Sequence, residues 1–254
     1  MRERNYGFLL SNLILRDFRI RYRNMSLGVF WSLLNPLIMM SVLTFIFTRI
    51  YRNSDIPHFH VFALCGIIPF NFFALAWISG TISIYSNGNL VKRVLFPREI
   101  VPIATVLANC IHFLIQVALL LVVVLLAGYA INPYWLLLPV VMAFEVIFVC
   151  GLSLASSALD VYFRDVRYVV ESANTLLFWL VPIFYSFSQI PSQFRSLYQY
   201  NPIAAVVLAS RHILLEAKAP PSTLLWKLAL VSFASLLAGL WIFGRLKRKF
   251  SDYL

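Results

Sequence analysis

Apolar residues occur along this chain in stretches about as long as a bilayer is thick, and the charged residues lie between them. A helix needs about 20 consecutive, mostly apolar residues to cross the hydrocarbon core, so each stretch predicts one transmembrane helix. Gly128, Asn132 and Pro133 divide the long uncharged stretch after Ile100 into two spans. The pattern therefore predicts an all-α polytopic membrane protein with a single transmembrane domain, 1–254, and six spans: 29–48, 60–84, 102–127, 134–158, 169–187 and 223–244.

Two segments outside these spans have their own patterns. Residues 5–23 place apolar side chains on one helical face and arginines on the other, which predicts an amphipathic helix in the membrane interface, either a charged anchor or a docking element. Residues 188–222 contain a short apolar run, 202–215, interrupted by Arg211 and His212. Apolar runs of about 10–14 residues are typical of re-entrant helices. We expect two short re-entrant helices on the outer side, shaping the exit of a pathway or only capping the bundle.

The composition supports the membrane assignment, and the sequence lacks the common motifs of nucleotide-binding and catalytic sites. The chain is 61% hydrophobic and 12% charged, with a mean hydropathy of +0.83, far from the values of soluble domains. None of its nine glycines precedes a lysine, so no ATP-binding P-loop is present. The sequence also lacks H-E-x-x-H, G-x-S-x-G and a pair of carboxylates at membrane depth, so we do not expect an enzyme. His58 and His60 form an H-x-H without a third ligand, so we expect a plain loop there rather than a metal site.

The positive charge gives the orientation. With six crossings both ends of the chain lie on one side, and fifteen of the 21 Lys and Arg residues fall on that side. Basic segments stay in the cytoplasm, so both termini are expected there and the protein in the inner, or plasma, membrane. The same placement explains the net charge of +11 without a nucleic-acid partner.

One charge lies within the expected spans. Glu145 is the only formally charged residue between Glu99 and Asp160, and a charge at membrane depth is costly unless it is paired, protonated or hydrated. His112 is expected at a similar depth in the preceding antiparallel span. We expect a structural His112–Glu145 contact rather than a role in transport.

Aromatic residues make up 16% of the chain, and many lie within the spans. Aromatic rings stack on the apolar faces of sugars and suit a polysaccharide channel, although rings in spans also pack helices or lie at headgroup level. The candidates for a channel are Trp31, Phe70, Phe73, Trp77, Trp179 and Tyr185.

Four motifs in order bring a family into view. They are LGVFWSLLNP at 27–36, GIIPFNFF at 66–73, NGNLVKRVLFPREIVP at 87–102 and LDVYFRDVR at 159–167. Together the motifs resemble the permeases of type-2 ABC exporters for polysaccharides, with the closest likeness to O-antigen exporters and their teichoic-acid and capsule relatives. The resemblance covers nearly the whole chain.

The resemblance implies a homodimeric channel above two copies of a separate ATPase chain, which would bind the ATP and Mg²⁺ that this chain does not. It implies a lipid-linked polysaccharide as substrate and membrane lipids as surroundings. It also implies a coupling helix at 90–99 and a second coupling loop after the fourth span. The implied ATPase-coupling residues are Lys92, Arg93, Phe96, Arg98, Glu99, Phe163, Arg164 and Asp165. Lys92 and Arg93 also have a simpler explanation as topology signals.

Three alternatives stay open. The chain could export teichoic acid or capsular polysaccharide, or it could be a drug or lipid permease of the same family. A membrane-embedded transferase or a scaffold acting without ATP would belong to another class. The transferase would need acidic or metal-binding clusters, which the sequence lacks.

Overall fold

The computed structural model describes residues 6–22, 28, 30–50, 56–93 and 96–253. Every regular element within them is helical, which confirms the all-α part of the prediction. The longer helices are α1 (Tyr6–Tyr22), α2 (Phe30–Phe45, continued by a π-helical turn, Ile46–Ile50), α3 (Phe59–Ser86), α5 (Ile100–Leu126), α6 (Leu138–Tyr162), α7 (Val166–Leu180) and α10 (Ser222–Leu246). The shorter ones are α4 (Gly88–Arg93), α8 (Ser192–Tyr200), α9 (Pro202–Leu214) and α11 (Phe250–Tyr253), with 3₁₀ turns at Pro133–Leu137, Phe187–Gln189 and Lys247–Lys249.

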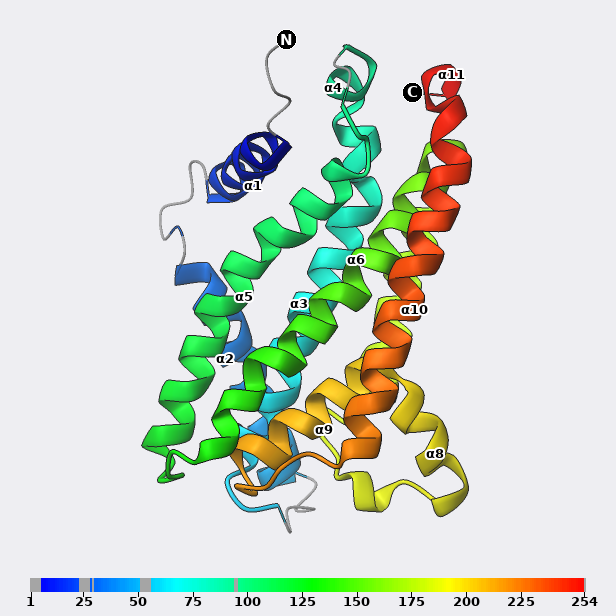
Figure 1. The fold of residues 1–254 in the computed structure, drawn as a ribbon. Coiled ribbons are helices and arrows are strands. Elements are labelled where there is room, and N and C mark those ends of the chain that lie inside the picture. The colour runs from blue at the N-terminus through cyan, green and yellow to red at the C-terminus, as the bar shows by residue number, and fades with distance from the viewer. Residues whose placement is uncertain (1–5, 23–27, 29, 51–55, 94–95, 254) are drawn as a thin grey trace.

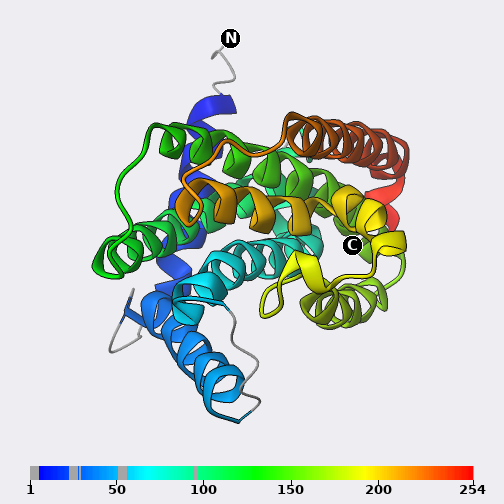
Figure 2. The ribbon, with the colours of Figure 1, turned by 90° about the horizontal axis from the view of Figure 1, so that it is seen from below.

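Helix α3 is the centre of the bundle. It packs against α2, α5, α6, α7 and α9, and 72% of its membrane-length window is buried. Helices α5 and α6 run beside it along the long dimension of the molecule, and α10 packs against α6, as Figure 1 shows. Helix α2 contacts only one side of this group, α3 and α5, and Figure 2 shows it standing away from the bundle. A large part of α2 therefore remains uncovered in the single chain.

Five helical segments in the described part of the chain are long and apolar enough to cross a membrane. They are Phe30–Ile50, Phe59–Ser86, Ile100–Leu126, Pro133–Asp160 and Ser222–Leu246. They overlie five of the six stretches that hydropathy predicts.

The remaining stretch, 169–187, is not one continuous helix. Helix α7 has 15 residues and ends at Leu180, so it is about 22 Å long against a hydrocarbon core of about 30 Å. It ends because Pro182 has no N–H to donate and disfavours helical backbone at Val181, which is extended at φ −73° and ψ 136°. The prediction of a helix through Phe187 is wrong for this reason.

The two short helices expected between 188 and 222 are present as α8 and α9. All but one of the α9 residues are buried, and the helix packs against α3, α6, α8 and α10. Seen from below in Figure 2, α9 crosses beneath the long helices. Asn201 caps its start by accepting hydrogen bonds from the N–H groups of Ile203 and Ala204 at 3.1 and 3.4 Å.

Helix α1 corresponds to the amphipathic segment expected at 5–23. Leu13 is buried and α1 packs against α5, while Phe8 and Ile20 are exposed. Helix α1 lies at the end of the bundle that also carries α4 and α11 (Figure 1). The residues with most of the predicted cytoplasmic charge are thus gathered at one end of the molecule.

Candidate functional site

A small hydrophobic cluster organises the end of the molecule that carries the predicted coupling residues. It joins the ends of α3, α6 and α10 to α4, α11 and the start of α5. Its buried members are Ile84, Val91, Val101, Leu154, Ala158, Val161, Phe243 and Phe250. Phe96 packs against this cluster and is half-buried. A movement of the 96–99 turn would therefore disturb the packing at the ends of α6 and α10.

The side chains of Arg98 and Glu99 bind the C-terminal segment of the same chain. Arg98 Nη1 donates to the Lys247 carbonyl at 2.8 Å, and its guanidinium lies 5.9 Å from the centre of the Phe250 ring. Lys247 Nζ forms an ion pair with Glu99 Oε1. Tyr162, at the end of α6, donates its hydroxyl to the Leu246 carbonyl at 2.7 Å. These contacts form what we call the C-terminal clamp.

The α6–α7 corner presents the other group of predicted coupling residues. Phe163 ends α6 with an extended backbone, and 67% of its surface is exposed. Arg164 and Asp165 are exposed beside it. The Arg164 guanidinium lies 5.0 Å from the centre of the Tyr85 ring, at the end of α3. The corner therefore offers an aromatic ring and both signs of charge to solvent.

A buried ion pair that sequence reasoning missed holds this corner. Asp160 is fully buried and accepts two hydrogen bonds from Arg167, at 3.2 Å from Nε and 3.1 Å from Nη2. Arg167 also lies 5.4 Å from the Tyr85 ring. Both charged residues belong to the motif at 159–167, and their seven-residue separation across a helix end was the available signal. The pair orients Phe163 and Arg164 relative to α3.

The two remaining basic candidates for coupling lie on the short helix α4. Lys92 is exposed on α4, while Arg93 ends that helix and its side chain lies outside the described residues. The segment expected as one coupling helix, 90–99, is a short helix to Arg93 followed by a turn at 96–99 that leads into α5.

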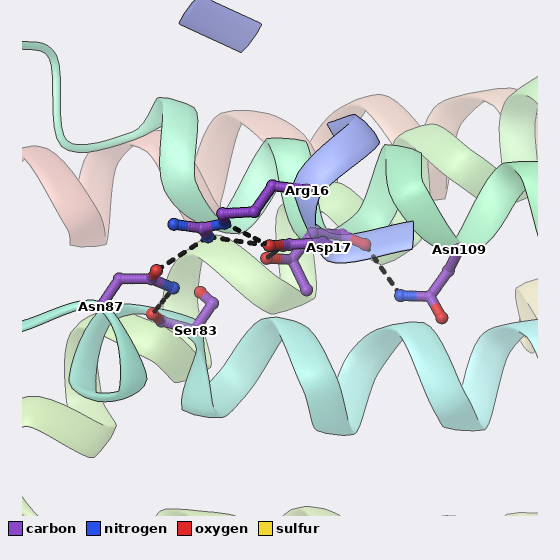
Figure 3. Close-up of polar contacts among 6 residues, drawn as sticks. Arg16, Asp17, Ser83, Asn87 and Asn109 are labelled. Carbon is purple, nitrogen blue, oxygen red and sulfur yellow. Dashed lines mark hydrogen bonds and ion pairs between the residues drawn. The ribbon is translucent and has the colours of Figure 1, made fainter. Parts of the chain in front are cut away.

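Helix α1 is tied to the same end by hydrogen bonds, drawn in Figure 3. Arg16 Nη2 donates to Asn87 Oδ1 at 2.8 Å and to Asp17 Oδ1 at 2.7 Å. Thr105 on α5 donates to the other Asp17 oxygen at 3.1 Å. Asn87 lies at the junction of α3 and α4, so α1 is hydrogen-bonded to the turn that leads into α4.

Aromatic rings form a continuous array inside the bundle. Phe73 on α3 lies 6.0 Å from Phe70, which lies 5.4 Å from Phe178 on α7. Phe178 in turn lies 6.0 Å from Phe184, and Phe184 lies 5.3 Å from Phe47. The array links α3, α7, the 181–186 segment and the π-helical turn after α2.

The six channel candidates differ in exposure. Phe70 and Phe73 are only 5% and 1% exposed, so they pack the protomer core in this conformation. Trp77 is half-buried beside Phe73, and Tyr185 is half-buried with its hydroxyl donating to the Leu180 carbonyl at 2.6 Å. Trp31 and Trp179 are 50% and 63% exposed, on α2 and α7. Only these two offer a large ring surface to a partner or a substrate.

Among the described residues, no hydrogen bond joins His112 to Glu145. Glu145 is fully buried, and neither of its carboxylate oxygens has a hydrogen-bond donor among the described residues. The His112 ring instead lies 3.3 Å from Gln116 Nε2, one turn along α5.

The described residues contain no group of three His, Cys, Asp or Glu side chains close enough to hold a metal ion. The three cysteines, Cys65, Cys110 and Cys150, are free and lie on α3, α5 and α6.

Comparison with known proteins identifies the family of this arrangement. Residues 9–215 match the family model described as ABC-2 type transporter, which covers most of the chain. The chain belongs to the ABC-2 type transporter family.

Relatives in this family match along nearly their whole length. The chain is 32% identical over 251 residues to the O-antigen export system permease protein RfbA of Myxococcus xanthus, covering 97% of this chain and 95% of the relative. It is 30% identical over 258 residues to RfbA of Klebsiella pneumoniae, covering 98% and 97%. It is 26% identical over 240 residues to the polysialic acid transport protein KpsM of Escherichia coli, covering 91% and 90%.

The ABC-2 type transporter match contains both groups of predicted coupling residues and all six aromatic candidates, but it ends at Leu215. Helix α10 and the residues of the C-terminal clamp beyond it lie outside the matched range.

Proposed function

We propose that this chain is the permease subunit of an ATP-driven exporter that moves a lipid-linked polysaccharide of the O-antigen type across the inner membrane. The observation that carries the proposal is its similarity, over at least 95% of both chains, to three permease proteins named for O-antigen export. The absence of a P-loop from the sequence means that a separate ATPase chain has to supply ATP hydrolysis.

The chain crosses the membrane six times, and α7 with the segment 181–186 forms the fifth crossing. Non-helical backbone is tolerated at membrane depth where it is buried in protein. Val181, Pro182 and Ile183 are buried, and Arg211 donates to the Ile183 carbonyl at 2.7 Å. An even number of crossings agrees with the position of α1, α4 and α11 at one end, where basic residues favour the cytoplasm.

The permease acts as a homodimer with two ATPase chains below it. Two features support a second copy: the uncovered surface of α2, and the exposed Trp179 on α7. The outward face of α7 also includes polar residues, Glu171, Ser172 and Thr175, which are exposed. A mixed polar and aromatic face is unfavourable against lipid and suits a hydrated channel between two copies. Trp31 and Trp179 are then the channel residues that contact the polysaccharide.

Coupling to the ATPase uses the α6–α7 corner and α4. Phe163, Arg164, Asp165 and Lys92 are exposed at the proposed cytoplasmic end and form its contact surface. Arg98 and Glu99 act inside the chain, because their side chains bind the C-terminal segment. Closure of the ATPase pair would shift the corner and the 96–99 turn as rigid elements.

A reconstituted complex of permease and ATPase tests this function. We expect a lipid-linked O-antigen glycan to raise ATP turnover and to be translocated in proteoliposomes. Phe163→Ala removes an exposed ring at the contact surface, so export per ATP should fall about tenfold or more. Phe194→Ala is the matched control, because Phe194 is 48% exposed on α8 at the opposite end.

If Phe163→Ala exports as much polymer per ATP as the wild type, Phe163 is not part of the ATPase contact. If no glycan raises ATP turnover, the proposed substrate class is wrong. The similarity to KpsM favours a capsular polysaccharide as the second candidate. The same assay with a polysialic acid substrate separates the two.

A further inference from the structure

A cavity of about 310 Å³ lies at the end of the molecule opposite α4 and α11. Its size is at the lower end of the range for ligand pockets, about 300–1,000 Å³. It is enclosed by α9, the starts of α3 and α10, and the turn at 186–188. The lining residues that the following argument uses are Phe62, Ser186, Ser188, Arg211, Glu216 and Thr223.

The cavity wall contains a buried cation. Arg211 is 5% exposed, and its guanidinium lies 3.4 Å from the centre of the Phe62 ring. Nη2 donates to the carbonyls of Ile183 and Phe62 at 2.7 and 3.2 Å. Nε and Nη1 have no acceptor, and no carboxylate lies within ion-pair distance among the described residues. A buried charge without a counterion is costly, and an anion in the cavity would offset that cost.

The start of α10 adds a second positive potential. Pro221 and Thr223 line the cavity, and the first turn of this 25-residue helix has neither an acidic residue nor a side-chain cap. The free N–H groups and the dipole at a helix N-terminus favour an anion there. The Ser186 and Ser188 hydroxyls are hydrogen-bonded to each other at 2.9 Å, which leaves the proton of one hydroxyl available as a further donor. Arginine, helix N-terminus and hydroxyls come from three separate segments and converge on one cavity.

The one acidic residue of the lining has its own partner. Glu216 is 2.9 Å from His212 Nδ1, and its side chain is 48% exposed. The ion pair directs its charge towards the histidine and solvent, so Arg211 remains the uncompensated charge of the cavity.

We propose that this cavity binds a phosphate group, with Arg211, the first turn of α10 and one hydroxyl of the Ser186–Ser188 pair as its donors. A phosphate presents several acceptor oxygens and a full negative charge, which this donor set matches. The group could belong to a membrane phospholipid or to a soluble or substrate phosphate. The site does not depend on the exporter assignment.

The test measures the unfolding temperature of the full-length chain in a neutral detergent, with sodium phosphate replacing sodium chloride at constant ionic strength. Phosphate should raise the unfolding temperature of the wild type in a saturable way, because a ligand that binds only the folded state stabilises it. Arg211→Gln should weaken the apparent affinity about tenfold or more, since a charge-assisted donor is lost. Lys218→Gln removes the same charge from an exposed residue at the same end and should leave the affinity unchanged.

Thr223→Asp keeps the test decisive if Arg211→Gln does not fold. Thr223 is exposed in the first turn of α10, so a carboxylate there is favourable for the helix and occupies the anion's place. The phosphate response should disappear in Thr223→Asp and persist in Thr223→Asn, because asparagine has the shape of aspartate without its charge. A wild type that does not respond to phosphate, or an equal response in wild type and Thr223→Asp, would overturn the proposal.

A second measurement identifies the source of the phosphate. Native mass spectrometry of the chain released from nanodiscs of phosphatidylglycerol and phosphatidylcholine shows which lipid it retains. Retention of phosphatidylglycerol by the wild type and its loss in Thr223→Asp would assign the site to a lipid headgroup. A phosphate response without a retained lipid would assign it to a soluble or substrate phosphate.

Discussion

Gly151 and Gly239 determine how closely α6 and α10 approach each other. A Cβ added to Gly239 would lie 2.2 Å from the Gly151 carbonyl oxygen, and one added to Gly151 would lie 2.4 Å from the Ser235 carbonyl carbon. Both neighbours are backbone atoms, which cannot move aside like a flexible side chain. Membrane helices gain stability from such close approach, because small residues allow dispersion contacts between backbones.

Gly239→Ala should therefore separate the two helices and destabilise the protein. Overpacking costs about 1–3 kcal/mol, and we expect a loss of that size in the free energy of unfolding, measured in mixed micelles. Gly244→Ala is the control on the same helix, because its added Cβ would meet nothing within 4 Å. Equal stability of the two variants would contradict the close-contact argument.

At the scale of elements, the C-terminal clamp connects the turn before α5 to the end of α10. The Glu99–Lys247 ion pair and the Arg98 hydrogen bond join residues about 150 positions apart in sequence. Phe250 is fully buried between these elements and packs edge-on against Phe243, with ring centres 5.4 Å apart. The segment after α10 is therefore part of the hydrophobic cluster at this end of the molecule and not a loose tail.

Reversing the Glu99–Lys247 pair tests whether the clamp contributes to coupling. Glu99→Lys or Lys247→Glu alone places like charges together and should lower export per ATP in the reconstituted complex. The double exchange restores the attraction and should recover most of the loss, as a coupled pair does in a double-mutant cycle. If the two single effects simply add in the double variant, the ion pair has no role in coupling.

Two exposed tryptophans, Trp179 on α7 and Trp226 on α10, separate a channel role from a lipid-facing one. Trp179 lies on a face that also carries polar residues, whereas Trp226, 76% exposed on α10, belongs to an apolar stripe with Leu230, Phe233 and Leu237. Trp179→Ala should reduce polymer flux severalfold, because a stacking surface for sugar rings is lost. Trp226→Ala should leave flux unchanged in the same assay. Equal flux in both variants would count against an aromatic channel surface on α7.

Hydropathy predicts the elements well where apolar length alone decides and less well where backbone chemistry intervenes. Five long helices follow the apolar stretches because burial in lipid requires length. The helix breaks at Val181 because of Pro182. The break leaves backbone carbonyls without helical partners, and Arg211 and Tyr185 donate hydrogen bonds to two of them, those of Ile183 and Leu180. A hydropathy window contains no information about those long-range partners.

At the scale of the whole molecule, the two ends differ in chemistry. One end gathers α1, α4, α11 and the α6–α7 corner with exposed basic and aromatic side chains. The other gathers α9, the starts of α3 and α10 and the turn at 186–188 around the cavity with its single uncompensated arginine. Export in one direction requires such a difference, since one end has to contact the ATPase and the other has to release the polymer.

The sequence predicts only part of the candidate site, because several of its contacts join residues that are far apart in the chain. The motifs at 87–102 and 159–167 located the exposed corner, because few charged residues are available in this chain. They could not show that Arg98 and Glu99 turn inwards to Lys247, or that Asp160 is buried against Arg167. Those contacts depend on how α3, α6 and α10 pack, which a single sequence does not specify.

The proposed orientation makes a direct prediction for labelling in spheroplasts, whose inner membrane is intact. Lys218 and Arg248 are exposed at opposite ends of the molecule, and Cys65 and Cys150 are buried, so a chain with Cys110→Ser provides a background of low reactivity. A membrane-impermeant maleimide should label the Lys218→Cys variant in spheroplasts and the Arg248→Cys variant only after permeabilisation. This follows because basic segments are retained in the cytoplasm and an even number of crossings returns the C-terminus there. The reverse pattern would invert the topology, and it would place the α6–α7 corner on the side where no ATPase is available.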